Sequence, residues 1–230
     1  MKTKLEIIVM VLIAGFVLSI IPQVVYAQQL DKKLEKDLTK KAKEQAKKME
    51  KSGWEVSGSS KTLEEAFFEH YAKEITEKTS EQVGEVSACK SVNVCRKNAL
   101  FNAQTDYAQQ VSSDIQGFAN EMQSNNSSLD IESDAFTSGF ETKIKADLSG
   151  ILKESFSMVR EKDGNKEYRM YFIINKEREG AARKSAMEAA LKETKLTMEQ
   201  SAMVSKFIED KFKEKEDEAV NSQMSELDSE

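Results

Sequence analysis

The spacing of apolar residues changes once along this chain, and that change constrains the fold more than any other feature. Over most of the sequence, apolar side chains recur every three or four residues, which is the period of an amphipathic helix. Between residues 151 and 175 they alternate, which is the period of a strand with one buried face. Asp163 and Gly164 separate the two alternating runs and supply the positive φ that a tight turn needs. The pattern predicts a β-hairpin within a mainly helical chain.

The helical pattern and the hairpin together predict one α+β domain over residues 28–213. Helices are expected over residues 30–52, 63–75, 100–122, 131–148, 178–191 and 197–213. An isolated hairpin is marginally stable in water, so it needs a third strand or helices on its apolar face. Residues 54–58 are the only other expected strand, because residues 78–94 show no period and are expected to form a loop. The fold class is therefore long amphipathic helices packed on a small antiparallel sheet.

The last helix and the end of the chain carry two further expectations. A capping box over residues 197–200 is expected to start the helix, and its buried side is expected to hold Met203, Val204, Phe207 and Ile208. Residues 214–230 contain seven acidic residues against Lys215 and few apolar groups, which indicates an acidic disordered tail.

Residues 1–27 have the three parts of a secretory signal: Lys2 and Lys4, an apolar run of 15 residues, and small residues at the end. The run is shorter than the roughly 20 residues that span a bilayer, so cleavage between Ala27 and Gln28 is expected. An uncleaved anchor is the alternative. The cleavage point lacks the lipobox cysteine that precedes lipid attachment. The sequence thus predicts export to the periplasm or outer cell envelope, with the cell surface as an alternative.

Cys89 and Cys95 are the two cysteines of the chain. In an oxidising compartment a close pair of this kind is expected to form a local disulfide, which stabilises the fold by about 2 kcal/mol according to the loop-entropy formula. A regular helix does not bring these two positions together, so residues 87–94 are expected to be a loop. A redox-active pair is the alternative, but the Cys-x-x-Cys spacing is absent.

Composition argues against most catalytic and nucleic-acid-binding classes. One histidine and two cysteines exclude the common Cys/His zinc sites, and the net charge of −6 gives no support for binding a phosphate backbone. His70 has Glu65, Glu69 and Glu74 near it in sequence, but no nucleophile motif accompanies it, so a structural or surface histidine is expected. We therefore predict no enzyme activity, no cofactor, no metal and no nucleic-acid partner.

The segment Lys32–Lys51 contains nine lysines beside a narrow stripe of small apolar residues. The stripe is expected to pack on the domain, with peripheral contact to a membrane or cell-wall polymer through the lysines as the alternative. Methionine and phenylalanine residues near the end of the chain are expected to fill the core, with an adaptable docking face as the alternative. These residues are Met187, Met198, Met203, Phe207, Phe212 and Met224.

Three segments within residues 90–176 carry a resemblance to a known family. They are the small-residue helix CRKNALFNAQTDYA from Cys95, the segment ADLSG that ends at Gly150, and the strand KEYRMYFIINK from Lys166. Together they resemble the LPP-type bacterial envelope lipoproteins and the related amino-terminal domain of a flagellar assembly protein. The resemblance implies a cell-envelope protein of small α+β fold that binds or assembles and has no known chemistry. The chain differs from the family by its missing lipobox, its Lys-rich first helix and its long last helix.

These features predict an exported bacterial cell-envelope protein that acts by binding, as a non-enzymatic subunit or adaptor with an envelope protein as partner. Two alternatives stay open. One is a hydrolase of cell-wall polymers that uses paired carboxylates, and the other is a surface-exposed protein that interacts with a host. The acidic residues mostly alternate with lysine on helical faces, which is typical of solvated helices and argues against the hydrolase. No pattern indicates an oligomeric state.

Overall fold

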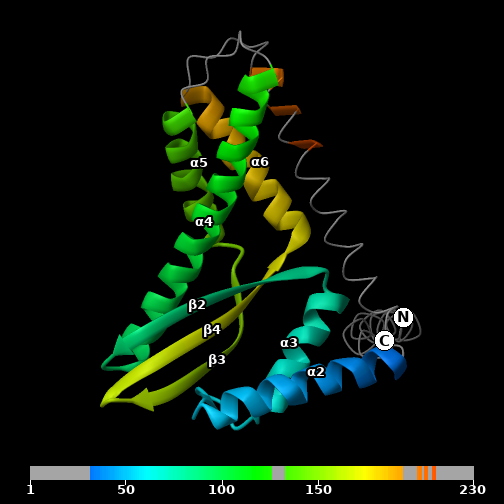
Figure 1. Ribbon diagram of the computed structural model, residues 1–230, viewed down its shortest axis with the longest axis vertical. Helices are drawn as coiled ribbons and strands as arrows, with labels where there is room; N and C mark the ends of the chain where they lie inside the picture. Colours follow the sequence, from blue (N-terminus) through cyan, green and yellow to red (C-terminus); the bar gives the residue numbers. More distant parts are fainter. Residues whose placement is uncertain (1–31, 126–132, 194–200, 204, 207–208, 211–230) are drawn as a thin grey trace, which may run out of the picture.

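The computed structural model describes residues 32–125, 133–193, 201–203, 205–206 and 209–210. The elements in chain order are α2 (Lys32–Lys51), β1 (Glu55–Val56), α3 (Leu63–Thr76), β2 (Thr79–Cys89), α4 (Val92–Asn125), α5 (Ser133–Leu148), β3 (Lys153–Lys162), β4 (Asn165–Asn175) and α6 (Lys176–Glu193). The predicted fold class is confirmed, because long helices surround a small antiparallel sheet (Figure 1). Among the described helices, none combines the length and the apolar character needed to cross a membrane.

The sheet has the strand order β1-β3-β4-β2, and every pair is antiparallel. The predicted hairpin is confirmed as β3 and β4, and both Asp163 and Gly164 in its turn have positive φ, as a tight turn of this kind requires. The expected short strand is also confirmed, since Glu55 and Val56 of β1 pair with Val159 and Met158 of β3. The hairpin, which would be marginally stable alone, is thus the centre of a four-stranded sheet.

The expectation that residues 78–94 form a loop is wrong. Strand β2 occupies most of this segment and pairs with β4 from Thr79 to Cys89, with an irregularity between Val86 and Cys89. Only Lys90 and Ser91 separate the end of β2 from the start of α4. The strand is not apparent from its composition because its backbone pairs with the apolar strand β4, whereas its own side chains are mostly polar or small.

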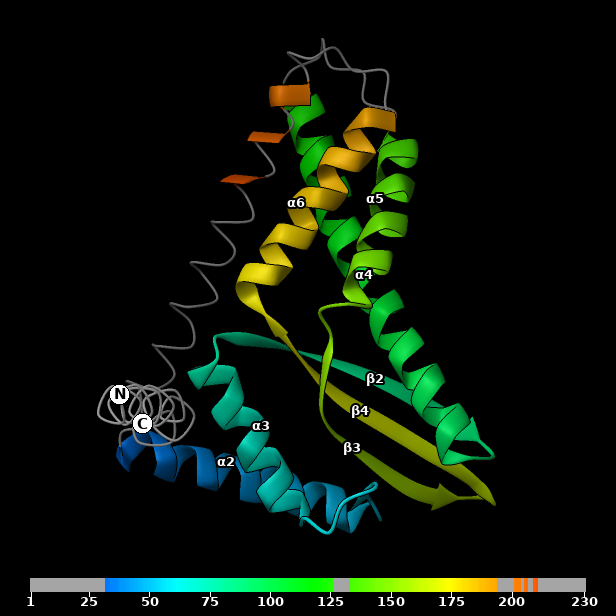
Figure 2. The same cartoon turned by 180° about the vertical axis from the view of Figure 1, so that it is seen from behind.

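Helices cover both faces of the sheet (Figures 1 and 2). Helices α2 and α3 pack on one face through a cluster that includes Phe67, Phe156 and Tyr171. The first half of α4 covers the other face, where Ala99 and Ala103 pack against residues of β3 and β4. The second half of α4 extends beyond the sheet and forms a bundle with α5 and α6. The described chain thus has a layered end, which contains the sheet, and an end made of helices alone.

The helix boundaries follow local capping signals. Thr62 starts α3 with a capping box, because its side chain accepts from Glu65 N and the Glu65 carboxylate accepts from Thr62 N. Helix α4 starts at Val92, eight positions before the expected start, because the Ser91 hydroxyl accepts from Val94 N in the first turn.

Several sequence predictions concern residues outside the described ranges, and the one about Met203 is wrong. The signal segment 1–27 with its cleavage site, the capping box at 197–200 and the acidic tail 214–230 lie outside the described ranges. Met203 is 46% exposed, so its expected burial is wrong. Met187 is buried in the bundle, which is the expected core role.

Candidate functional site

The single histidine lies in the interior of the layered end. His70 has no exposed surface, and its ring lies 5.5 to 5.7 Å, between centroids, from the rings of Tyr71, Phe156 and Tyr171. Its Nε2 lies 2.6 Å from a carboxylate oxygen of Glu81, and its Nδ1 has no hydrogen-bond partner within the described residues. Among the residues that the structure describes, the one hydrogen-bond contact of this buried imidazole is therefore with Glu81.

A second carboxylate approaches the same imidazole. Glu74 lies one helical turn after His70 on α3, and Glu81 reaches the pair from β2. One donor atom from each residue can be chosen so that the three lie within 4.8 Å of one another. Burial raises the pKa of Glu74, the neighbouring His70 lowers it, and the negative charge of Glu81 raises it further. The site therefore places two like charges beside one imidazole in a partly dry environment.

The neighbouring tyrosines respond to the same environment. Burial raises the pKa of Tyr71, and the nearby Glu81 carboxylate raises it further. Burial also raises the pKa of Tyr171, although a hydrogen bond from Arg169 lowers it. Both phenols therefore stay protonated at neutral pH and present polar, uncharged groups near the carboxylates.

The sequence alone predicts the proximity of only two of these three residues. His70 and Glu74 share one face of a helix at the i, i+4 spacing, which the sequence shows directly. Glu65 and Glu69 do not join the site, because Glu65 caps its own helix and Glu69 pairs with Lys61. Sequence reasoning missed Glu81, because the segment that carries it was expected to be a loop.

The apolar stripe of α2 packs on the domain, as expected. Leu38, Ala42 and Ala46 are buried and belong to the cluster between α2, α3 and the sheet. The stripe is thus not free to insert into a bilayer, and what α2 presents to solvent is its polar surface.

All nine lysines of α2 are exposed. Five of them follow one another at steps of three or four residues, and we name these five the lysine ridge: Lys36, Lys40, Lys43, Lys47 and Lys51. Within the described residues, none of the five forms an ion pair. Like charges at this spacing destabilise a helix by a few tenths of a kcal/mol per pair, and the exposed Glu44 and Glu50, three or four residues from Lys40 and Lys47, offset part of this repulsion.

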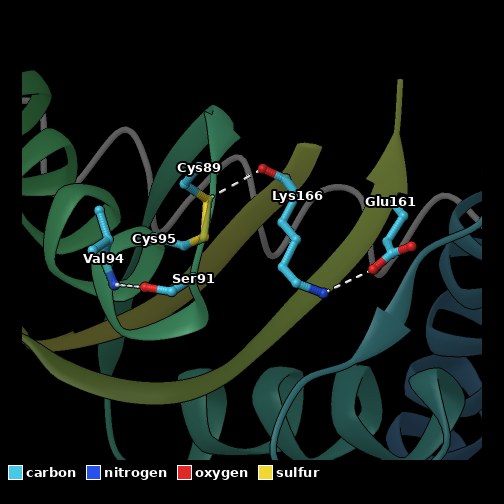
Figure 3. The surroundings of a disulfide bond; sticks show 6 residues. All are labelled: Cys89, Ser91, Val94, Cys95, Glu161 and Lys166. Carbon is cyan, nitrogen blue, oxygen red and sulfur yellow. Dashed lines mark hydrogen bonds and ion pairs between the residues drawn. A yellow bond between two sulfur atoms is a disulfide. The ribbon is translucent and has the colours of Figure 1, made fainter. Parts of the chain in front are cut away.

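Cys89 and Cys95 lie at disulfide distance and connect the end of β2 to the first turns of α4 (Figure 3). Their Cα atoms are 5.5 Å apart, and both side chains are buried. The expected loop over residues 87–94 is wrong, since a strand and a helix meet at this pair with only two residues between them. The Cys89 sulfur also lies 3.2 Å from the Lys166 carbonyl oxygen, where β4 begins.

A second polar cluster, which the sequence did not reveal, joins the layered end to the bundle. The buried carboxylate of Glu179 in α6 accepts hydrogen bonds from Tyr107 of α4, at 2.7 Å, and from Ser80 of β2, at 2.8 Å. Arg183 pairs with the same carboxylate and also donates to the Tyr107 hydroxyl. Burial and the Glu179 charge raise the pKa of Tyr107. Every partner belongs to the chain itself, so we assign this cluster a structural role.

Comparisons of the chain with family models, with curated proteins and with solved structures gave no match. The resemblance of residues 90–176 to envelope lipoproteins therefore stays a prediction.

Proposed function

We propose that this protein is exported to the bacterial cell envelope and acts there by binding, as a non-enzymatic subunit or adaptor of an envelope assembly. The signal pattern of residues 1–27 supports export. The pairing of Cys89 with Cys95 is consistent with an oxidising compartment, where disulfides persist. The resemblance of residues 90–176 is the basis for the assembly role.

The observation that carries the binding role is the lysine ridge. It concentrates five positive charges on one exposed face, although the whole chain has a net charge of −6. An acidic partner surface would gain charge complementarity with these exposed lysines. The apolar stripe of the same helix argues against a membrane as the partner, since Leu38, Ala42 and Ala46 are buried against the domain. We therefore propose an acidic surface of an envelope protein as the partner.

The test is cross-linking of the tagged full chain in cells with a light-activated reagent that does not react through lysine amines, followed by mass spectrometry of the products. The test variant combines Lys40→Glu, Lys43→Glu and Lys47→Glu on the ridge. The matched control combines Lys97→Glu, Lys153→Glu and Lys192→Glu, which make the same charge change at exposed lysines elsewhere. Circular dichroism confirms that both variants fold.

We expect one acidic protein partner with the parent chain and with the control, and at least a tenfold loss with the ridge variant. The mass of the mature amino terminus should show a chain that starts at Gln28. Equal recovery of the partner by the ridge variant would overturn the proposed surface. Recovery of lipid or glycan alone would show that the partner is a lipid surface or a cell-wall polymer and not a protein.

The second candidate is a hydrolase of cell-wall polymers. The only paired carboxylates brought together within the described residues beside the histidine are Glu74 and Glu81, but their donor oxygens lie within 4.8 Å, closer than the about 5 to 10 Å between the carboxyl groups of glycosidases, which weighs against this candidate. Incubation of the purified chain with cell-wall glycan tests it. Turnover that disappears in Glu74→Gln would establish this candidate, and no turnover by the parent chain would remove it.

A further inference from the structure

Three metal-binding side chains converge where α3 meets the edge strand β2. His70, Glu74 and Glu81 each offer a donor atom, and these atoms lie within 4.8 Å of one another. We propose that the three residues bind one divalent cation and that Zn²⁺ is the metal they select. The site belongs to this chain alone, so the proposal does not depend on the partner proposed above.

The donor set and its spacing suit zinc. Zn²⁺ binds imidazole nitrogen and carboxylate oxygen at about 2.0–2.2 Å in a tetrahedron, which puts neighbouring donors about 3.4 Å apart. Here His70 Nε2 and the Glu81 oxygen are 2.6 Å apart, and the chosen donors of the cluster span no more than 4.8 Å. A bound Zn²⁺ would displace the proton between His70 Nε2 and the Glu81 carboxylate and widen this contact towards the tetrahedral value. Three protein ligands leave the fourth position to water.

The imidazole ligand indicates which class of cation the site prefers. Ca²⁺ and Mg²⁺ take oxygen ligands almost exclusively and prefer six or more of them, whereas a site with one nitrogen and two carboxylates favours Zn²⁺ or a neighbouring transition metal. His70 is fully buried, and within the described residues its only polar contact is with this cluster. A buried imidazole with no other polar function is thus available as a ligand.

The electrostatics of the cluster favour a cation. Glu74 has no hydrogen bond or ion pair within the described part of the chain, and Glu81 has only its contact with His70. A divalent cation between the two carboxylates would neutralise their like charges.

A metal at this position would join two elements that otherwise share few contacts. His70 and Glu74 belong to α3, and Glu81 belongs to β2, whose outer edge has no neighbouring strand in the described sheet. The Glu81 side chain is 36% exposed, which gives the ion a path from solvent. Metal binding would therefore stabilise the packing of α3 on the sheet, because the ligands converge only in the folded chain.

The test is calorimetric titration of the chelator-treated full chain with Zn²⁺ alone. The test variants are Glu74→Gln and Glu81→Gln, which remove one ligand each and keep the buried His70 in place. The control is Glu77→Gln, which makes the same charge change at an exposed position between the two ligands. Co²⁺ substitution with visible spectroscopy then reports the coordination geometry.

We expect one equivalent of Zn²⁺ per chain for the parent and for the control, and at least tenfold weaker binding for each ligand variant, since loss of an outer partner alone costs about 10- to 100-fold. The visible bands of Co²⁺ should be those of a four-coordinate site. Thermal unfolding should shift upwards with Zn²⁺ in the parent and not in the ligand variants. The absence of stoichiometric binding, equal binding by the ligand variants, or tighter binding of Ca²⁺ than of Zn²⁺ would each overturn the proposal.

Discussion

Gly84 of strand β2 lies directly against the backbone of Ala99 in helix α4. A Cβ atom at position 84 would lie 2.0 Å from the Ala99 carbonyl oxygen, a distance that atoms do not adopt. The nearest obstacle is backbone, so it has no flexible end that can move aside. The lack of a side chain at this position therefore sets how closely α4 packs on the sheet.

Replacing Gly84 with alanine should destabilise the fold by about 3 kcal/mol, because overpacking forces a backbone shift. The measurement is the free energy of unfolding from urea denaturation. The matched control is Gly117→Ala, at an exposed position of α4 with nothing within 4 Å of the added Cβ. The control should stabilise the helix by up to about 1 kcal/mol, since alanine is the better helix former. Equal stability of the two variants would contradict this account of the packing.

Strand β2 marks the limit of what the sequence reveals about the fold. Helices and the β3–β4 hairpin have apolar side chains at a clear period, so their type could be predicted. In residues 78–94 the signals that indicate a loop have structural roles: Gly84 of β2 makes room for α4, and Ser91, which follows β2, caps α4. Both roles depend on α4, whose position the local sequence of this segment does not indicate. Pairing with β4 outweighs the weak local preference.

The link between Cys89 and Cys95 should stabilise the protein by about 2 kcal/mol, because it closes a short loop in the unfolded chain. Urea denaturation with and without a reductant measures this difference. Intact mass should be about two hydrogens lower before reduction than after it.

A variant with Cys89→Ala and Cys95→Ala is the control for the disulfide, since a reductant should leave its unfolding midpoint unchanged. It should unfold at a lower urea concentration than the oxidised parent. Free thiols in protein taken directly from the cell envelope would contradict the pairing.

The buried Glu179 carboxylate should be among the most sensitive polar positions. Glu179→Ala should cost about 3–5 kcal/mol, because it removes the buried carboxylate that accepts from Ser80 and Tyr107 and pairs with Arg183. Tyr107→Phe removes one neutral donor to the same carboxylate and should cost only about 1–2 kcal/mol. Unfolding free energies from urea denaturation check both values. A loss below 1 kcal/mol in Glu179→Ala would show that the cluster does not hold α6 to α4.

The candidate site shows why a site was harder to predict than a helix. His70 and Glu74 share a helix face, so their proximity follows from the helix period alone. Glu81 becomes their neighbour only because the chain turns after α3 and returns as β2. The alternation of β2 then places Glu81 on the face towards α3, and neighbours on the other face, such as Gln82 and Gly84, contact α4. Because β2 was not predicted from the sequence, Glu81 was not recognised as a candidate metal ligand.

Glu167 should make stability fall in acid. It faces Arg160 across the β3–β4 pair, and the hydrogen bond from Arg160 holds the pKa of Glu167 below its ordinary value of 4.5. The unfolded chain then binds the proton more readily, so the contribution of this pair is complete above the unfolded pKa and is lost as pH falls through the folded pKa. Urea midpoints should therefore show Glu167→Gln less stable than the parent at pH 7, with the difference shrinking in acid as Glu167 is protonated. Glu177→Gln, at an exposed position of α6, is the control and should show no such convergence. A constant difference between Glu167→Gln and the parent from pH 7 to pH 3 would contradict the role of the pair.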